Sequence, residues 1–309
     1  MSSTDDSPTD STARSSVDRP GGGATLAGRA VARVGYGAMQ LARLHDDRPA
    51  AVALVRRAVD LGVDHIDTAH FYGNGFVNGV LREALRPEDE VLVVSKIGAD
   101  PSPHGPYPSS AQRPEQLRAS VEDNLTSLGL EQIPVVNLRR NDVGFAAVGS
   151  GEQEVAIDDQ LAEMIALREE GKIGAIGLSS VTVDGVIRAL PAGIVCVQNP
   201  YSLLARDDEG LLSVCLREGI AWVPYFPLGS AVPGMPKVTD SPMVIRVATE
   251  LDVSPAQVGL AWLLQHSPNT LLIPGTTDVR HLEANVAAGS VTLGAASVEL
   301  LGEISRGWA

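Results

Sequence analysis

Short apolar segments rich in β-branched residues alternate along this chain with longer amphipathic segments, and no other feature constrains its fold as strongly. The alternation begins near residue 32 and continues to residue 275. It is typical of parallel strands joined by crossover helices. The eight candidate strands read ARVGYG, DHIDTA, VLVVSK, PVVNLR, KIGAIGLS, GIVCVQ, IAWVPY and TLLIPG, and they start at residues 32, 64, 91, 134, 172, 193, 220 and 270.

Three of the connecting segments predict helices with particular clarity. Residues 48–62, 113–130 and 158–171 carry apolar side chains at spacings of three and four, and each has a glycine just after its last predicted turn. Eight strand–helix pairs in about 260 residues match an α/β fold of the closed (β/α)8, or TIM-barrel, type. A doubly wound open sheet is the alternative, but its G-x-G-x-x-G phosphate fingerprint does not follow the first strand.

The start of the chain has a different composition. Residues 1–23 read MSSTDDSPTDSTARSSVDRPGGG, which offers almost no apolar side chain to bury. Such a segment is expected to be a disordered tail. We therefore predict a tail over residues 1–23 and a single barrel domain over residues 24–309.

Charge and composition exclude several classes of partner. The chain has 24 basic and 38 acidic side chains, a formal net charge of -14, which disfavours nucleic acids and anionic membrane surfaces. No apolar run reaches the roughly 18 residues of a membrane span, and the N-terminus lacks signal-peptide order. The only cysteines, Cys196 and Cys215, lie in apolar stretches typical of buried, reduced thiols. We expect a cytoplasmic protein that acts on a small molecule; the sequence does not determine the oligomeric state, for which a monomer is the working assumption.

Three residues at predicted strand ends form a chemically coherent group. Asp67 ends the second strand, Lys96 ends the third, and Tyr72 follows Asp67 in a glycine-bounded loop. A tyrosine hydroxyl has an ordinary pKa of about 10, which a neighbouring ammonium lowers. The trio therefore suggests a general acid that protonates a carbonyl oxygen. An ion pair at the barrel mouth beside an unrelated tyrosine is the alternative.

The motifs around this trio resemble those of the aldo-keto reductases. The runs GVDHIDTAHFYGNG, VLVVSKIG and IPGTTDVRHLEAN carry the resemblance, which extends from about Thr25 to Arg306. It implies a barrel enzyme that reduces a carbonyl compound with NADPH. In that family Asp67 would orient the lysine, Tyr72 would donate the proton and Lys96 would lower the tyrosine pKa.

The fourth strand departs from the family pattern. Where the family usually has a histidine, the stretch PVVNLRR has Arg139. A guanidinium cannot shuttle a proton, but it can polarise a carbonyl oxygen or bind a substrate anion. Alternatively, Arg139 merely pairs with a nearby acid. With GYGAMQL, VQNPYSLL and FPLG, this strand resembles the bacterial pyridoxal reductase branch, which implies a pyridine aldehyde that hydrogen-bonds to Arg139 and Asn137.

A cofactor site follows from the last strand and from the resemblance. The run IPGTTDVRHLEAN opens a helix with Thr277 or Asp278 in the capping position, so backbone amides there can bind a phosphate, and Arg280 adds charge for the 2′-phosphate of NADPH. The resemblance implies that Tyr225 stacks on the nicotinamide. The predicted cofactor-binding residues are Gly37, Ala38, Met39, Ser179, Gln198, Tyr225, Phe226, Pro227, Leu228, Gly229, Ser230, Gly275, Thr276, Thr277, Arg280, Glu283 and Asn285.

Two classes of function remain open from the sequence. The intact trio favours a carbonyl reductase. The missing histidine is the one argument for a non-catalytic, nucleotide-binding regulatory subunit on the same fold. A metal enzyme is not expected, because no cysteine or carboxylate set with zinc spacing accompanies His65 and His70.

Overall fold

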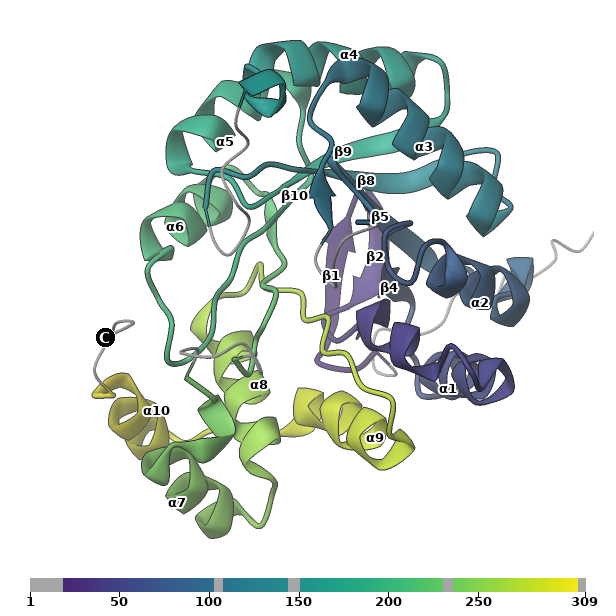
Figure 1. Ribbon diagram of the computed structural model, residues 1–309. Helices are drawn as coiled ribbons and strands as arrows, with labels where there is room; N and C mark the ends of the chain where they lie inside the picture. Colours follow the sequence, from purple (N-terminus) through teal and green to yellow (C-terminus); the bar gives the residue numbers. More distant parts are fainter. Residues whose placement is uncertain (1–18, 103–107, 144–150, 230–235, 305–309) are drawn as a thin grey trace, which may run out of the picture.

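The computed structural model describes residues 19–102, 108–143, 151–229 and 236–304, and it contains a parallel sheet surrounded by helices (Figure 1). The seven strands of this sheet follow the order β11-β10-β9-β8-β5-β4-β3, with all neighbours parallel. The strands are β3 (Tyr36–Gly37), β4 (His65–Asp67), β5 (Leu92–Ile97), β8 (Ile133–Arg139), β9 (Ile173–Ser179), β10 (Cys196–Gln198) and β11 (Ala221–Trp222).

The eighth predicted strand closes the sheet into a barrel. Residues 270–275 form isolated parallel bridges to both edges, Trp222 with Thr270 on one side and Val34 with Leu272 on the other. Backbone hydrogen bonds of 2.8 Å join the Leu271 N–H to the Trp222 carbonyl and the Leu272 N–H to the Arg33 carbonyl. The predicted (β/α)8 barrel is therefore confirmed.

Helices cover the outside of the barrel, as Figure 1 shows. The helix predictions over 48–62, 113–130 and 158–171 are confirmed as α1, α3 and α4. Among the described residues no single helix is long and apolar enough to cross a membrane, although the bent pair Val279–Ser290 with Ala295–Gly302 passes by length and composition together. The helices are α1 (Arg48–Asp60), α2 (Phe76–Ala84), α3 (Pro114–Leu128), α4 (Ile157–Glu169), α5 (Val183–Ala189), α6 (Glu209–Arg217), α7 (Pro242–Leu251), α8 (Pro255–His266), α9 (Val279–Ala287) and α10 (Ala295–Gly302).

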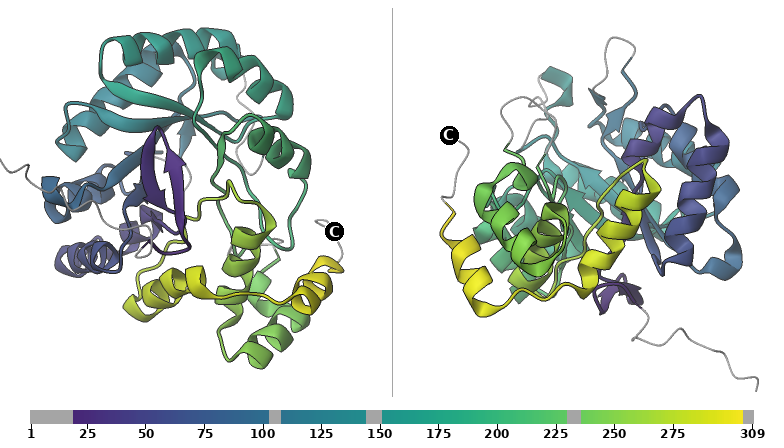
Figure 2. Two further views of the ribbon diagram at one scale, coloured as in Figure 1. Left: turned by 180° about the vertical axis from the view of Figure 1, so that it is seen from behind. Right: turned by 90° about the horizontal axis from the view of Figure 1, so that it is seen from below.

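A β-hairpin that the sequence analysis did not predict lies across one end of the barrel (Figures 1 and 2). It consists of antiparallel β1 (Gly23–Leu26) and β2 (Arg29–Ala32). The two turn residues between them, Ala27 and Gly28, both have positive φ angles, 51° and 76°, as in a type I′ turn. The hairpin contributes Leu26 and Val31 to the apolar cluster inside the barrel.

The hairpin also shows that the predicted tail boundary at residue 23 is too late. The Arg19 Nε donates to the Asp64 carboxylate at 3.1 Å, and the Val34 N–H donates to the Pro20 carbonyl at 3.0 Å. Residues 19–23 therefore belong to the folded structure. The rest of the predicted tail, residues 1–18, lies outside the described residues.

Candidate active site

Asp67, Lys96 and Tyr72 converge at the barrel mouth, as their spacing predicted. Asp67 ends β4 and Lys96 lies near the end of β5, with side chains 4% and 6% exposed. The Lys96 Nζ donates to the Asp67 Oδ1, to the Thr68 carbonyl at 3.3 Å and to the Tyr72 hydroxyl at 3.1 Å. The ammonium is thus held between a carboxylate and a phenol. This geometry confirms that the three residues form one group.

The loop after β4 presents Tyr72 to Lys96. Three successive residues have positive φ angles: Gly73 at 63°, Asn74 at 51° and Gly75 at 81°. Glycine and asparagine tolerate this left-handed conformation better than other residues do. The turn closes through a 2.7 Å hydrogen bond from the Gly75 N–H to the His70 carbonyl. The sequence Gly-Asn-Gly therefore folds the chain sharply just after the tyrosine.

A fourth side chain completes the group, and the sequence analysis gave it only a cofactor role. Gln198 ends β10 and is fully buried, and its Nε2 donates to the Asp67 Oδ2 at 2.7 Å. Each oxygen of Asp67 thus accepts a hydrogen bond. The alternation of β10 places Cys196 and Gln198 on the same face of the strand. That alternation is the signal that could have indicated the contact.

The pKa values of the group follow from burial and charge. Burial raises the pKa of Tyr72, the Lys96 charge opposes that rise, and the net direction is upward. The predicted action of Lys96 is therefore present, because its charge and hydrogen bond lower the pKa of Tyr72, but burial outweighs it. Burial alone would lower the pKa of Lys96, but Asp67 and Tyr72 raise it above the ordinary value. At neutral pH the site consequently holds a protonated phenol beside a charged ammonium.

Arg139 and Asn137, predicted to bind substrate together, lie in different environments. Arg139 ends β8, is half-buried, and donates from Nη1 to the Asn141 Oδ1 at 3.0 Å. Asn137 is fully buried inside the barrel, where its Oδ1 accepts a hydrogen bond from the Cys196 thiol at 3.2 Å. The Arg139 charge acts to lower the pKa of Tyr72, and Arg139 pairs in register with Ser179 of β9. Asn137 is part of the barrel interior, and its predicted contact with a substrate stays a prediction.

The residues predicted to hold a nicotinamide gather on the opposite strands. Ser179 ends β9 and is 2% exposed. Tyr225 is half-buried, and its hydroxyl lies 3.1 Å from the hydroxyl of Ser180, a residue with a φ angle of 54°. The Oε1 of Gln198 is buried and accepts no hydrogen bond among the described residues. This side of the mouth therefore offers an aromatic ring and an unused amide oxygen.

The glycine positions predicted for the cofactor lie where strands and loops pack closely. A Cβ on Gly37 would lie 2.4 Å from the Ile273 carbonyl oxygen, and one on Gly275 would lie 2.5 Å from the Gly37 carbonyl oxygen. Beside them Ala38 is fully buried, whereas Met39 is 41% exposed. Met39 is thus the member of this segment whose side chain reaches the surface.

The loop after β11 is described only in part. It includes Phe226, Pro227, Leu228 and Gly229, while Ser230 lies outside the described residues. A Cβ on Gly229 would lie 2.1 Å from the Pro236 carbonyl oxygen, so this position requires glycine. The predicted contact of this loop with a pyrophosphate stays a prediction.

The start of α9 differs from the expected phosphate site. Asp278 is the N-cap, and its Oδ1 accepts from the backbone N–H groups of Arg280 at 2.8 Å and His281 at 3.3 Å. Its Oδ2 also lies 3.1 Å from the Arg280 Nη2. These hydrogen bonds lower the pKa of Asp278 to about 2. A carboxylate therefore already occupies the amides and the guanidinium that were predicted to bind a phosphate.

The other predicted residues of this region are arranged around that cap. Thr276 and Thr277 are accessible to solvent, and the Thr276 Oγ1 accepts from the Asp278 N–H at 3.1 Å. Glu283 forms an ion pair with Arg57 of α1, whose Nε lies 2.9 Å away, so it connects two helices. Asn285 is 7% exposed. Among the described residues no group of three His, Cys, Asp or Glu side chains is arranged to hold a metal ion.

Comparison with known proteins was made for sequence and for structure. The family model described as the aldo/keto reductase family matches residues 33–306. Pyridoxine 4-dehydrogenase of Escherichia coli (strain K12) is 42% identical over 289 residues, which cover 91% of this chain and 98% of that protein. An uncharacterized oxidoreductase of Schizosaccharomyces pombe is 36% identical over 291 residues, which cover 91% and 89%. The crystal structure of an aldo-keto reductase from Klebsiella pneumoniae in complex with NADPH superposes with a TM-score of 0.73 at 24% identity, covering 88% of this chain and 90% of that one.

Proposed function

The chain belongs to the aldo/keto reductase family, and we propose on that premise that it interconverts an aldehyde and a primary alcohol with NADPH as the reductant. The observation that carries the proposal is the 3.1 Å contact between the Tyr72 hydroxyl and the Lys96 ammonium, which is itself paired with Asp67. We further propose a substrate of the pyridoxal type. Its support is the 42% identity to a pyridoxine 4-dehydrogenase over nearly the full length of that protein.

The residues present suit a nicotinamide cofactor. The buried Gln198 Oε1 has no described partner, and an amide N–H of a carboxamide would satisfy it. Tyr225 offers a ring held by Ser180, and Gly275 and Thr277 are exposed beside the start of α9. We assign the ring contact to Tyr225, the carboxamide contact to Ser179 and Gln198, and the phosphate contacts to the loop around Gly275.

In this mechanism the protein contributes a proton donor, Tyr72, held in a fixed position beside Lys96. When bound, the dihydronicotinamide supplies a hydride, which carries two electrons to the carbonyl carbon. Tyr72 gives its hydroxyl proton to the carbonyl oxygen, so the aldehyde becomes an alcohol. The phenolate that remains is stabilised by the Lys96 ammonium, which Asp67 keeps charged and oriented. Solvent then returns the proton to Tyr72.

The test is the oxidation of NADPH, followed by absorbance, with pyridoxal beside benzaldehyde, an aliphatic aldehyde and a sugar aldehyde. We expect turnover with NADPH well above that with NADH, and the fastest turnover with pyridoxal. Turnover confined to the other aldehydes would support the proposed reductase activity but contradict the proposed pyridoxal-type substrate. Tight NADPH binding without any turnover would favour the non-catalytic regulatory subunit instead.

A further inference from the structure

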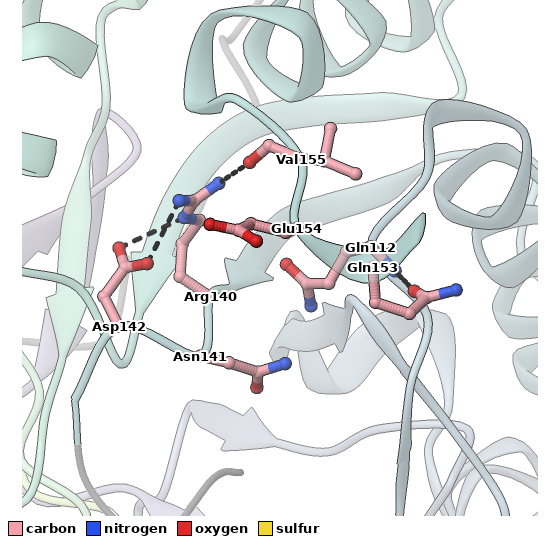
Figure 3. Close-up of a pocket in the computed structure, with 7 residues that line it drawn as sticks. All are labelled: Gln112, Arg140, Asn141, Asp142, Gln153, Glu154 and Val155. Carbon is pink, nitrogen blue, oxygen red and sulfur yellow. Dashed lines mark hydrogen bonds and ion pairs between the residues drawn. The ribbon is translucent and has the colours of Figure 1, made fainter. Parts of the chain in front are cut away.

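Two consecutive arginines at the end of β8 have very different partners. Arg140 donates to both oxygens of Asp142, at 3.1 Å and 3.0 Å, and to the Val155 carbonyl at 3.0 Å (Figure 3). It also donates to the Gln160 side chain. Its charge is compensated within a small polar pocket whose lining residues Figure 3 labels. The guanidinium of Arg140 is therefore engaged in hydrogen bonds within the protein and is not free to bind a ligand.

Arg139 has no such compensation. Of the five N–H groups of its guanidinium, one donates to a described protein atom, the Asn141 Oδ1 at 3.0 Å. Among the described residues no carboxylate forms an ion pair with Arg139, and its pKa is lowered by burial while Tyr225 and Tyr72 act to raise it. A half-buried cation without a counterion is costly. An anion that binds beside it would remove that cost.

The guanidinium is also held in place. The Asn141 Nδ2 donates to the Ser110 Oγ at 2.7 Å, which fixes the amide so that its oxygen faces Arg139. Ser110 belongs to β7 (Ser109–Ser110), which pairs with β6 (Ala99–Asp100) in the segment that follows β5. Arg139 is thereby positioned by a neighbouring loop. Asn141 is a positioning residue in this arrangement.

Arg139 lies on β8, the strand between β5, which carries Lys96, and β9, whose Ser179 pairs in register with Arg139. Its charge lowers the pKa of both the Tyr72 and the Tyr225 hydroxyls. In β8, Arg139 lies two residues beyond Asn137, which pairs in register with Lys96. Arg139 therefore lies two residues nearer the barrel mouth than Lys96 does, on the same face of the sheet. A carbonyl oxygen that receives the Tyr72 proton would lie close to the guanidinium.

We propose that Arg139 determines specificity by binding an ionised hydroxyl on the carbon next to the one that bears the aldehyde. The inference rests on the proposed function and names its substrate class, ortho-hydroxy aromatic aldehydes. In such a compound the two oxygens point to the same side, so one guanidinium can contact both. The ring hydroxyl of a 3-hydroxypyridine-4-carbaldehyde is ionised near neutral pH. It stays bound through its charge while Tyr72 protonates the carbonyl oxygen.

The experiment compares two aldehydes that differ in one hydroxyl, 3-hydroxypyridine-4-carbaldehyde and pyridine-4-carbaldehyde. We expect kcat/KM of the wild-type enzyme to favour the hydroxylated compound by about 10- to 100-fold, the range of a hydrogen bond to a charged group. Arg139→Met should bring that ratio close to one. Arg140→Met is the matched control, because it removes the adjacent guanidinium that the protein already pairs, and it should keep the wild-type ratio.

Two further variants guard against a folding defect. Arg139→Lys keeps the charge without the planar fork and should retain part of the preference. Asn141→Ala leaves the guanidinium in place but unheld, so it should raise KM for the hydroxylated aldehyde with little change in kcat. A wild-type ratio that persists in Arg139→Met, or equal use of both aldehydes by the wild type, would overturn the proposal while leaving the reductase intact.

Equilibrium binding separates failure of the inference from failure of the proposed function. The absorption band of the hydroxypyridine ring changes with ionisation, so it reports the bound anion directly. As the pH is lowered, we expect the bound hydroxypyridine to remain ionised to a lower pH in the wild type than in Arg139→Met. If no aldehyde is reduced yet this difference persists, Arg139 binds the anion and the reductase assignment fails. If aldehydes are reduced and the bands are the same in both proteins, the inference fails alone.

Discussion

The two sides of the barrel mouth are built in different ways. On the acid side Asp67, Lys96 and Gln198 lie at or near the ends of strands paired in register, so strand alternation alone aims them at one point. On the cofactor side Gly37 and Ser179 lie on strands, but most of the predicted residues lie in loops and at the start of α9, where Asp278 takes the amides. Strand geometry thus determines where a side chain points. At the start of a helix, by contrast, a side chain of the protein and an external ligand can compete for the same backbone N–H groups.

The largest expected effect tests the acid side. Tyr72→Phe removes a single oxygen, the one that donates the proton, and it should lower kcat for aldehyde reduction by about 10²- to 10⁴-fold. The affinity for NADPH, measured by the quenching of protein fluorescence, should stay near the wild-type value because the ring remains. Wild-type turnover by Tyr72→Phe would remove Tyr72 from the mechanism.

The next effect concerns stability on the same side. Lys96→Met leaves the Asp67 carboxylate buried with only the Gln198 amide to offset it, which should lower the free energy of unfolding by about 3–5 kcal/mol. The double variant Lys96→Met/Asp67→Asn removes the stranded charge and should recover much of that loss. Urea denaturation measures both.

Lys172→Met is the control for this stability test. Lys172 pairs with Glu122 and Glu170 at the surface, so its loss should change the free energy of unfolding far less. If Lys96→Met and Lys172→Met were equally stable, the buried pair would not be the stabilising feature that its burial indicates.

The pH dependence of the reaction sharpens the comparison further. Because burial raises the pKa of Tyr72 above its ordinary value, the hydroxyl stays protonated through the neutral range. Reduction needs that proton, so kcat should be independent of pH up to about 10 and fall only above it. Alcohol oxidation needs the phenolate and should rise with pH over the same range. If kcat for reduction began to fall near pH 7, bound ligands would have to lower the pKa of Tyr72 and so reverse the effect of burial.

Much of the acid side could be predicted from the sequence because period-two patterns decide where strand residues point. The barrel and the positions of Asp67, Lys96 and Arg139 follow from that rule, whereas Tyr72 was predicted from the glycine-bounded loop after Asp67. Burial does not follow from it, and so the direction of the Tyr72 pKa and the interior position of Asn137 were not predicted. Hydrogen-bond partners do not follow either, and Gln198 is the example: its amide contacts Asp67 as well as facing the predicted cofactor side.

The differences at the other places have local causes. The hairpin over residues 23–32 was missed because each strand has only four residues and the first starts within a glycine-rich stretch that resembles the preceding tail. At α9 the sequence offered Thr277 and Asp278 as caps and a phosphate as a ligand for the same amides. Capping propensity does not show whether a carboxylate of the chain or the phosphate of a ligand binds these backbone amides more strongly.

The smallest expected effect addresses that competition directly. Asp278→Asn keeps a good N-cap but removes the charge and frees the Arg280 guanidinium, so NADPH should bind several-fold more tightly while NADH binding stays unchanged. The pKa of Asp278 is lowered to about 2, so the carboxylate remains ionised at any pH used for the assay and titration cannot replace the substitution. Asp184→Asn, which removes an exposed acid from the first turn of α5, is the matched control. Weaker NADPH binding by Asp278→Asn would mean that the ion pair holds Arg280 in its productive position, and the cofactor side would then be as fully built as the acid side.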